Sequence, residues 1–164
     1  QHDYLRQVVL ACQRLVQDGF QIVLIPFHYK RDLVVSQRLA EAIGPGASCS
    51  AQPQNSRELL RDLAQAQVVV AMRLHALIMG AICQRPLVGI SYDPKVDGFL
   101  QTVGQPLAGS TADLKAERLY QLVRDAYERR EEITQSLATS LQELRALAKE
   151  NAAIAYALAA GKIR

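Results

Sequence analysis

Two short motifs, twenty residues apart at their key positions, contain residue types that bind and protonate anionic substrates. Arg73 and His75 stand in residues 72–75 (MRLH), and Lys95 stands in residues 91–97 (SYDPKVD). Arginine and lysine supply positive charge, and histidine exchanges a proton near neutral pH. Together these side chains can hold a small dianion such as a phosphate ester and transfer a proton to it.

A third polar segment contains His28 and Asp32, and Tyr92 lies within the second motif. Each of these polar groups also has a simpler structural interpretation. A histidine at a helix start can cap backbone groups, and Arg73 can pair with a surface carboxylate. The Asp93–Pro94 pair is ordinary chemistry for the first turn of a helix.

Strand and helix patterns alternate over the first two thirds of the chain. Unbroken apolar runs such as residues 22–25 predict strands buried on both faces of a parallel sheet, with helices covering both faces. All strand-to-helix junctions of such a sheet share one edge, so the polar segments should lie together there. The predicted strands cover 22–25, 47–52, 68–71 and 86–91, and the predicted helices include 33–43, 55–66, 74–83 and 94–103.

The pattern becomes purely helical near residue 113. This change divides the chain into a Rossmann-like α/β domain over residues 1–112 and a helical segment over residues 113–164. The apolar tail at residues 152–160 should dock on the sheet or on a domain outside this chain. A coiled-coil dimer arm is the alternative, although the seam between residues 133 and 147 covers only two to three heptads.

Composition excludes several classes of protein. The 164 residues carry a net charge of +3 without a basic run, and they include no tryptophan, which argues against nucleic-acid binding. Three widely spaced cysteines favour a reducing cytosol over disulfides or a zinc site. No metal motif, glycine-rich phosphate loop or membrane-spanning stretch is present in the sequence. Because the chain begins with Gln1, we expect a fragment of a longer protein.

The MRLH motif at residues 72–75, followed by residues 86–96 (PLVGISYDPKV), resembles the polysaccharide pyruvyl transferase family. The resemblance is strongest over residues 21–103. It implies the C-terminal half of a two-domain enzyme similar to the GT-B glycosyltransferases. It also implies transfer of a ketal pyruvate from phosphoenolpyruvate, the co-substrate, to a nucleotide-linked or lipid-linked sugar of a cell-surface polysaccharide precursor, with release of phosphate. The implied location is cytoplasmic, at the inner membrane face where the acceptor is lipid-linked.

The resemblance also suggests a role for each residue. The family's motif histidine falls on His75, which is either the general acid or a phosphate ligand. Arg73 and Lys95 would bind phosphoenolpyruvate together with Tyr92, while His28 and Asp32 would contact the acceptor or a nucleotide. No metal or cofactor is implied. The N-terminal half of the family's architecture would complete the site, so this chain alone should be inactive.

Two other functions fit the same sequence. A GT-B glycosyltransferase domain would bind a nucleotide sugar at the same edge of the sheet, and it would need a carboxylate for the ribose. A non-catalytic module would dimerise through residues 133–147 and would not respond to small anions.

Overall fold

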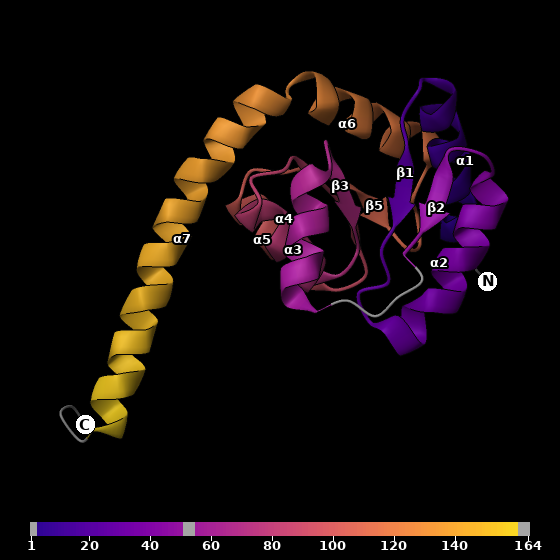
Figure 1. The fold of residues 1–164 in the computed structure, drawn as a ribbon. Coiled ribbons are helices and arrows are strands. Elements are labelled where there is room, and N and C mark those ends of the chain that lie inside the picture. Colours follow the sequence, from indigo (N-terminus) through magenta and orange to yellow (C-terminus); the bar gives the residue numbers. More distant parts are fainter. Residues whose placement is uncertain (1–2, 51–54, 161–164) are drawn as a thin grey trace.

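Short parallel strands alternate with helices along the chain, as a computed structural model of residues 3–50 and 55–160 shows (Figure 1). The predicted α/β class is confirmed, and helices lie on both faces of the strands. The strands are β1 (Ile22–Leu24), β2 (Ala47–Cys49), β3 (Val69–Ala71), β4 (Leu87–Ser91) and β5 (Leu107–Ser110). The helices are α1 (Asp3–Gln17), α2 (Tyr29–Ile43), α3 (Ser56–Gln65), α4 (Leu74–Ile82), α5 (Pro94–Thr102), α6 (Ala116–Glu128) and α7 (Arg130–Ala159).

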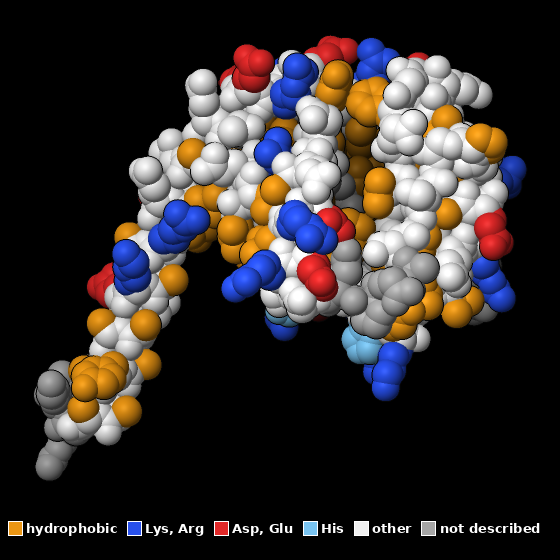
Figure 2. All heavy atoms as spheres, in the orientation of Figure 1, with side chains coloured by type: hydrophobic (Ala, Val, Ile, Leu, Met, Phe, Trp, Pro, Cys, Tyr) orange, Lys and Arg blue, Asp and Glu red, His pale blue; other side chains and the backbone are white. Residues whose placement is uncertain are grey.

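The described strands form two separate parallel sheets. β1 pairs with β2, while β3, β4 and β5 form the other sheet with β4 in the middle. The side chains of Val23 in β1 and Val70 in β3 are 60% and 41% exposed, so the prediction of complete burial is wrong for these two strands. Figure 2 shows a groove in this face of the molecule, with hydrophobic side chains along it.

β4 separates two hydrophobic clusters. Leu87 belongs to the cluster with α3, α4, α5 and α7, whereas Val88 and Ile90 belong to the cluster with α1 and α6. All five residues of β4 are buried, as the unbroken apolar run predicts for a central strand. Helix α6 therefore shares a core with residues on the other side of position 112, although the division at that position stays a prediction.

Gly89 sets the distance between β4 and α5. A Cβ atom built on Gly89 would overlap the side chain of Leu100, which is 1% exposed. The helix can therefore lie directly on the strand only because position 89 has no side chain. This close approach fixes the start of α5 relative to the end of β4.

Local signals set several helix ends. Asn55 and Glu58 form the predicted capping box of α3, and the Asp93 carboxylate accepts a hydrogen bond from the Lys95 backbone N–H at 2.9 Å. Helix α2 begins at Tyr29, four residues earlier than predicted from the apolar pattern. The first turn of α2 is polar, so periodicity did not reveal it.

Two further elements differ from the sequence prediction. β5 was not predicted, because its residues (LAGS) include no β-branched or aromatic side chain. The predicted third strand is confirmed in part as β2, while residues 51–52 lie outside the described residues.

Helix α7 extends far beyond the rest of the molecule (Figure 1). Its 30 residues make a rod of about 45 Å. Leu137 and Leu141 are buried, but the tail that was expected to dock is exposed, with Tyr156 at 69%. Docking of this tail on the sheet is therefore wrong for the described residues. Among residues 3–50 and 55–160, no helix has the length and apolar character needed to cross a membrane.

Substitution of Gly89 by alanine should destabilise the fold by about 1–3 kcal/mol, because the added methyl group overpacks the contact with Leu100. Urea unfolding followed by circular dichroism measures this loss. Gly98→Ala is the matched control within α5, since a Cβ at position 98 meets nothing within 4 Å. The control should leave stability unchanged or raise it by up to about 1 kcal/mol. Equal effects of both substitutions would contradict the role assigned to Gly89.

Candidate functional site

Each of the three polar segments follows the carboxyl end of a strand, as the sequence predicts, but β1 stands in a different sheet from β3 and β4. His28 and Asp32 follow β1, Arg73 and His75 follow β3, and the segment from Tyr92 to Lys95 follows β4. Because these strands are parallel within each sheet, each segment stands at a carboxyl end. Figure 2 shows histidine side chains at the lower edge of the view, near Lys or Arg side chains.

Asp32 and Arg73 join two of these segments directly. The Arg73 Nε–H donates to Asp32 Oδ2 at 2.8 Å, and Nη2 donates to Oδ1 at 2.5 Å. This two-bond geometry fixes the plane of the guanidinium group. The simpler interpretation of Arg73, pairing with a carboxylate, is therefore observed. The pair also links α2 to the start of α4, across the gap between the two sheets.

The surroundings of Asp32 favour its ionised form. Partial burial acts to raise the pKa of this carboxyl, but hydrogen bonds from Arg73 and from the His28 backbone N–H outweigh it. The pKa of Asp32 is consequently lower than its ordinary value. The same hydrogen bond to Asp32 raises the pKa of Arg73, and the Tyr92 phenol contributes to the shift electrostatically. Tyr92 therefore lies close enough to interact with the pair.

His75 is exposed and is the second residue of α4. The helix is capped by Arg73, whose side chain makes no capping hydrogen bond. The alternative in which the His75 imidazole caps backbone groups is not observed, and the imidazole has no bonded partner within residues 3–50 and 55–160. The first backbone N–H groups of α4 point toward its amino end, where His75 also lies.

Lys95 is likewise exposed and is the second residue of α5. Its backbone N–H is taken by Asp93, but its ammonium group forms no ion pair with the described residues. Two side chains that can carry positive charge therefore stand near the first turns of neighbouring helices, without an internal counter-ion. Such an arrangement can bind an anion from solution.

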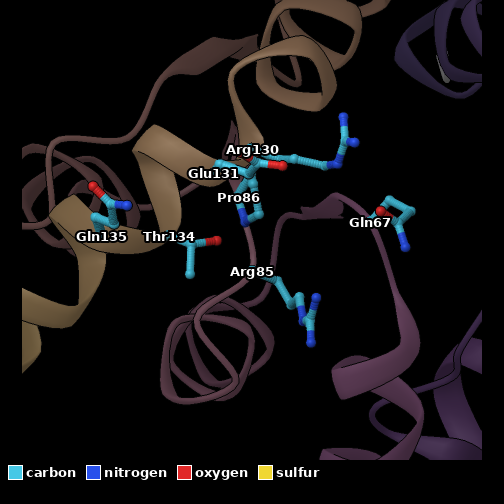
Figure 3. Close-up of a pocket in the computed structure, with 7 residues that line it drawn as sticks. All are labelled: Gln67, Arg85, Pro86, Arg130, Glu131, Thr134 and Gln135. Carbon is cyan, nitrogen blue, oxygen red and sulfur yellow. The ribbon is translucent and has the colours of Figure 1, made fainter.

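Two hollows among the described residues lie away from these side chains. One of about 360 Å³ lies beside the amino ends of β3 and β4, under the start of α7 (Figure 3). The Thr134 hydroxyl donates to the Gln84 carbonyl at 3.0 Å, and Arg130 stacks on Tyr127. These contacts attach the start of α7 to the α/β part of the chain. We therefore interpret the hollow as a gap left where α7 packs on that part. Its lining residues are Gln67, Arg85, Pro86, Arg130, Glu131, Thr134 and Gln135.

Among the described residues, no group of three histidine, cysteine or acidic side chains is arranged to hold a metal ion. The three cysteines are unpaired. Burial raises the pKa of Cys12 to about 11, which keeps this thiol protonated and unreactive near neutral pH.

An open α/β domain with free cationic groups at the carboxyl edge of its strands is typical of ligand-binding domains in enzymes. A family model described as polysaccharide pyruvyl transferase matches residues 1–94, more than half of the chain. The chain therefore belongs to the polysaccharide pyruvyl transferase family. The match includes His28, Asp32, Arg73, His75 and Tyr92, and it ends one residue before Lys95. No curated protein matched the chain.

Asp32→Asn should lower the free energy of unfolding by about 1–2 kcal/mol at pH 7, because it removes a two-bond, partly buried ion pair. The contribution exists where Asp32 is ionised. It should be lost as the pH falls below about 4, through the lowered pKa of this carboxyl.

The measurement is urea unfolding of wild type and variant at pH 7 and at successively lower pH, where the difference should shrink. Asp97→Asn is the control, because Asp97 is exposed in α5 and forms no ion pair with the described residues. A difference between wild type and Asp32→Asn that stays constant down to pH 2 would contradict the pairing.

Proposed function

We propose that this chain binds phosphoenolpyruvate at the edge formed by β1, β3 and β4, as the donor domain of a pyruvyl transferase. The observation that supports this most strongly is the placement of His75 and Lys95, exposed and without internal partners, at the starts of α4 and α5. Phosphoenolpyruvate carries a phosphate and a carboxylate, and both need cations or N–H donors.

In the proposed reaction, Lys95 and the open side of the Arg73 guanidinium bind the two anionic groups. His75 donates a proton to the methylene carbon, which becomes a methyl group, and positive charge develops on the neighbouring enol carbon. Two sugar hydroxyls form C–O bonds to that carbon, and the bond from that carbon to the phosphate oxygen breaks. One hydroxyl proton replaces the proton from His75, and the other leaves with phosphate.

Asp32 acts in this proposal on Arg73 rather than on the substrate. Its carboxylate occupies Nε and Nη2, which leaves Nη1 for a ligand and holds the guanidinium plane in one orientation. Tyr92 interacts electrostatically with Arg73, and His28 stands on the segment that precedes α2, where an acceptor can reach it in this proposal. The acceptor contacts, in this proposal, come mainly from a second α/β domain, as in the GT-B architecture, on the cytoplasmic side of the membrane.

A titration of the isotopically labelled chain with phosphoenolpyruvate, followed by amide chemical shifts, tests the donor site. Shifts should concentrate at residues 73–75 and 92–96. Lys95→Ala should weaken binding by at least about tenfold, because it removes a charge-assisted contact. Lys149→Ala, on the exposed part of α7, is the matched control and should leave binding unchanged.

His75→Gln separates the two roles considered for this residue. Loss of phosphoenolpyruvate binding would indicate a phosphate ligand, whereas unchanged binding would fit a proton donor. A parallel titration with a nucleotide sugar is the opposing test. Shifts at this edge with the nucleotide sugar but none with phosphoenolpyruvate would contradict the proposal and favour a glycosyltransferase domain.

A further inference from the structure

The distal part of α7 presents an apolar stripe that the other described residues do not cover. Leu147, Ile154 and Leu158 are 56%, 45% and 53% exposed, and Asn151 lies between them. The spacing of these four residues is four, three and four, which is the heptad spacing of a helix that pairs with another helix. Figure 2 shows hydrophobic side chains along this part of the rod. We call these four residues the distal stripe.

The distal stripe continues the surface by which α7 packs on its own body. Leu137, Leu144, Asn151 and Leu158 are separated by seven residues each, so they lie along nearly the same line of the helix. Leu137 is fully buried under the body, while Leu158 stands beyond it. The same kind of surface is therefore covered at one end of α7 and open at the other (Figure 1).

We propose that the distal stripe pairs with the distal stripe of a second copy of this chain, in an antiparallel arrangement. In a parallel pair, the partner helix would continue along α7 into the space beside Leu137. The residues of α3, α4 and α5 that share a cluster with Leu137 already occupy that space. An antiparallel partner runs outward instead, and the two bodies then lie at opposite ends of the paired helices. The contact is isologous and closed, as expected for a twofold dimer.

The stripe is complementary to itself in this orientation. Leu147 of one copy meets Leu158 of the other, and Asn151 meets Ile154, so that four layers form with apolar residues at both ends. The two Asn151 amides then lie within about one helical turn of each other along the axis, where they can hydrogen-bond. Ala148 and Ala155 flank the stripe, and their small side chains let the two backbones approach closely.

Charge favours a protein partner over a lipid surface. The described residues from 143 to 160 contain Glu143, Arg145, Lys149 and Glu150, which sum to zero. A helix that lies on an anionic membrane carries an excess of lysine and arginine on its polar face. The distal part of α7 has no such excess, whereas its heptad spacing fits a second helix.

Sedimentation velocity of the 164-residue chain from about 1 to about 200 µM tests the proposal, over a range suited to a small interface. The chain should change from monomer to dimer with concentration. Ile154→Glu should weaken association by at least about 100-fold, because it places a charge in the centre of the contact. Ala153→Glu is the matched control, since position 153 lies on the opposite side of the helix, and it should leave association unchanged.

Asn151→Leu gives a second, independent readout. A polar residue at a core position costs stability in a helix pair, so the substitution should strengthen association by about tenfold. Circular dichroism of each variant verifies that the helix is intact. Small-angle scattering of the dimer should show two lobes at opposite ends of a rod.

A chain that stays monomeric throughout the range would overturn the proposal. So would a dimer that is insensitive to both Ile154→Glu and Asn151→Leu, or one whose lobes lie side by side. These outcomes are independent of the donor site, because none of the substitutions lies near His75 or Lys95.

Discussion

The burial of β4 is the constraint on which the rest of the molecule depends. Its side chains alternate between two hydrophobic clusters, so that helices must pack on both faces of the strand. The buried Gln105 side chain accepts the hydrogen bond of the Leu87 N–H at 3.0 Å, which satisfies a backbone group at the start of the strand. Gly89 admits α5 against the strand. Lys95 is the second residue of α5, so its position depends on how α5 packs against β4 at Gly89.

The second link in the site is electrostatic. The two sheets share no described strand pairing, but the Asp32–Arg73 pair connects their carboxyl ends. Partial burial makes this connection stronger than an exposed ion pair, and the two-bond geometry makes it directional. Arg73 is thus held in place before any ligand arrives. His75 and Lys95 differ from Arg73, because their charged or titratable groups are left without internal partners and are available to solvent.

Helix α7 changes from buried to exposed along its length. Its first half closes the hydrophobic cluster above α4, and its second half carries the same kind of apolar surface into solvent. The exposed leucine and isoleucine residues of the second half, at heptad spacing, form the surface that we propose pairs with a second copy. The attachment of α7 through Thr134 and Arg130 also explains the hollow seen under its start.

The sequence by itself determined the α/β class, the caps of α3 and α5, and the strand ends that carry His75 and Lys95. These features follow from local patterns: apolar runs of strand length, helix-start residues, and the rule that parallel strands end at one edge. The family was also readable from the two motifs, and the family match agrees. β5 was missed because its four residues carry no strong strand preference.

Tertiary structure alone decided three features. Asp32 and Arg73 are 41 residues apart, and no local pattern indicates that they pair. The separation of the sheets, with Val23 and Val70 exposed, depends on which strands hydrogen-bond and not on hydropathy. The projection of α7 depends on where the body ends, which an apolar pattern cannot specify. Each is a relation between distant segments, and such relations are fixed by packing and geometry rather than by spacing along the chain.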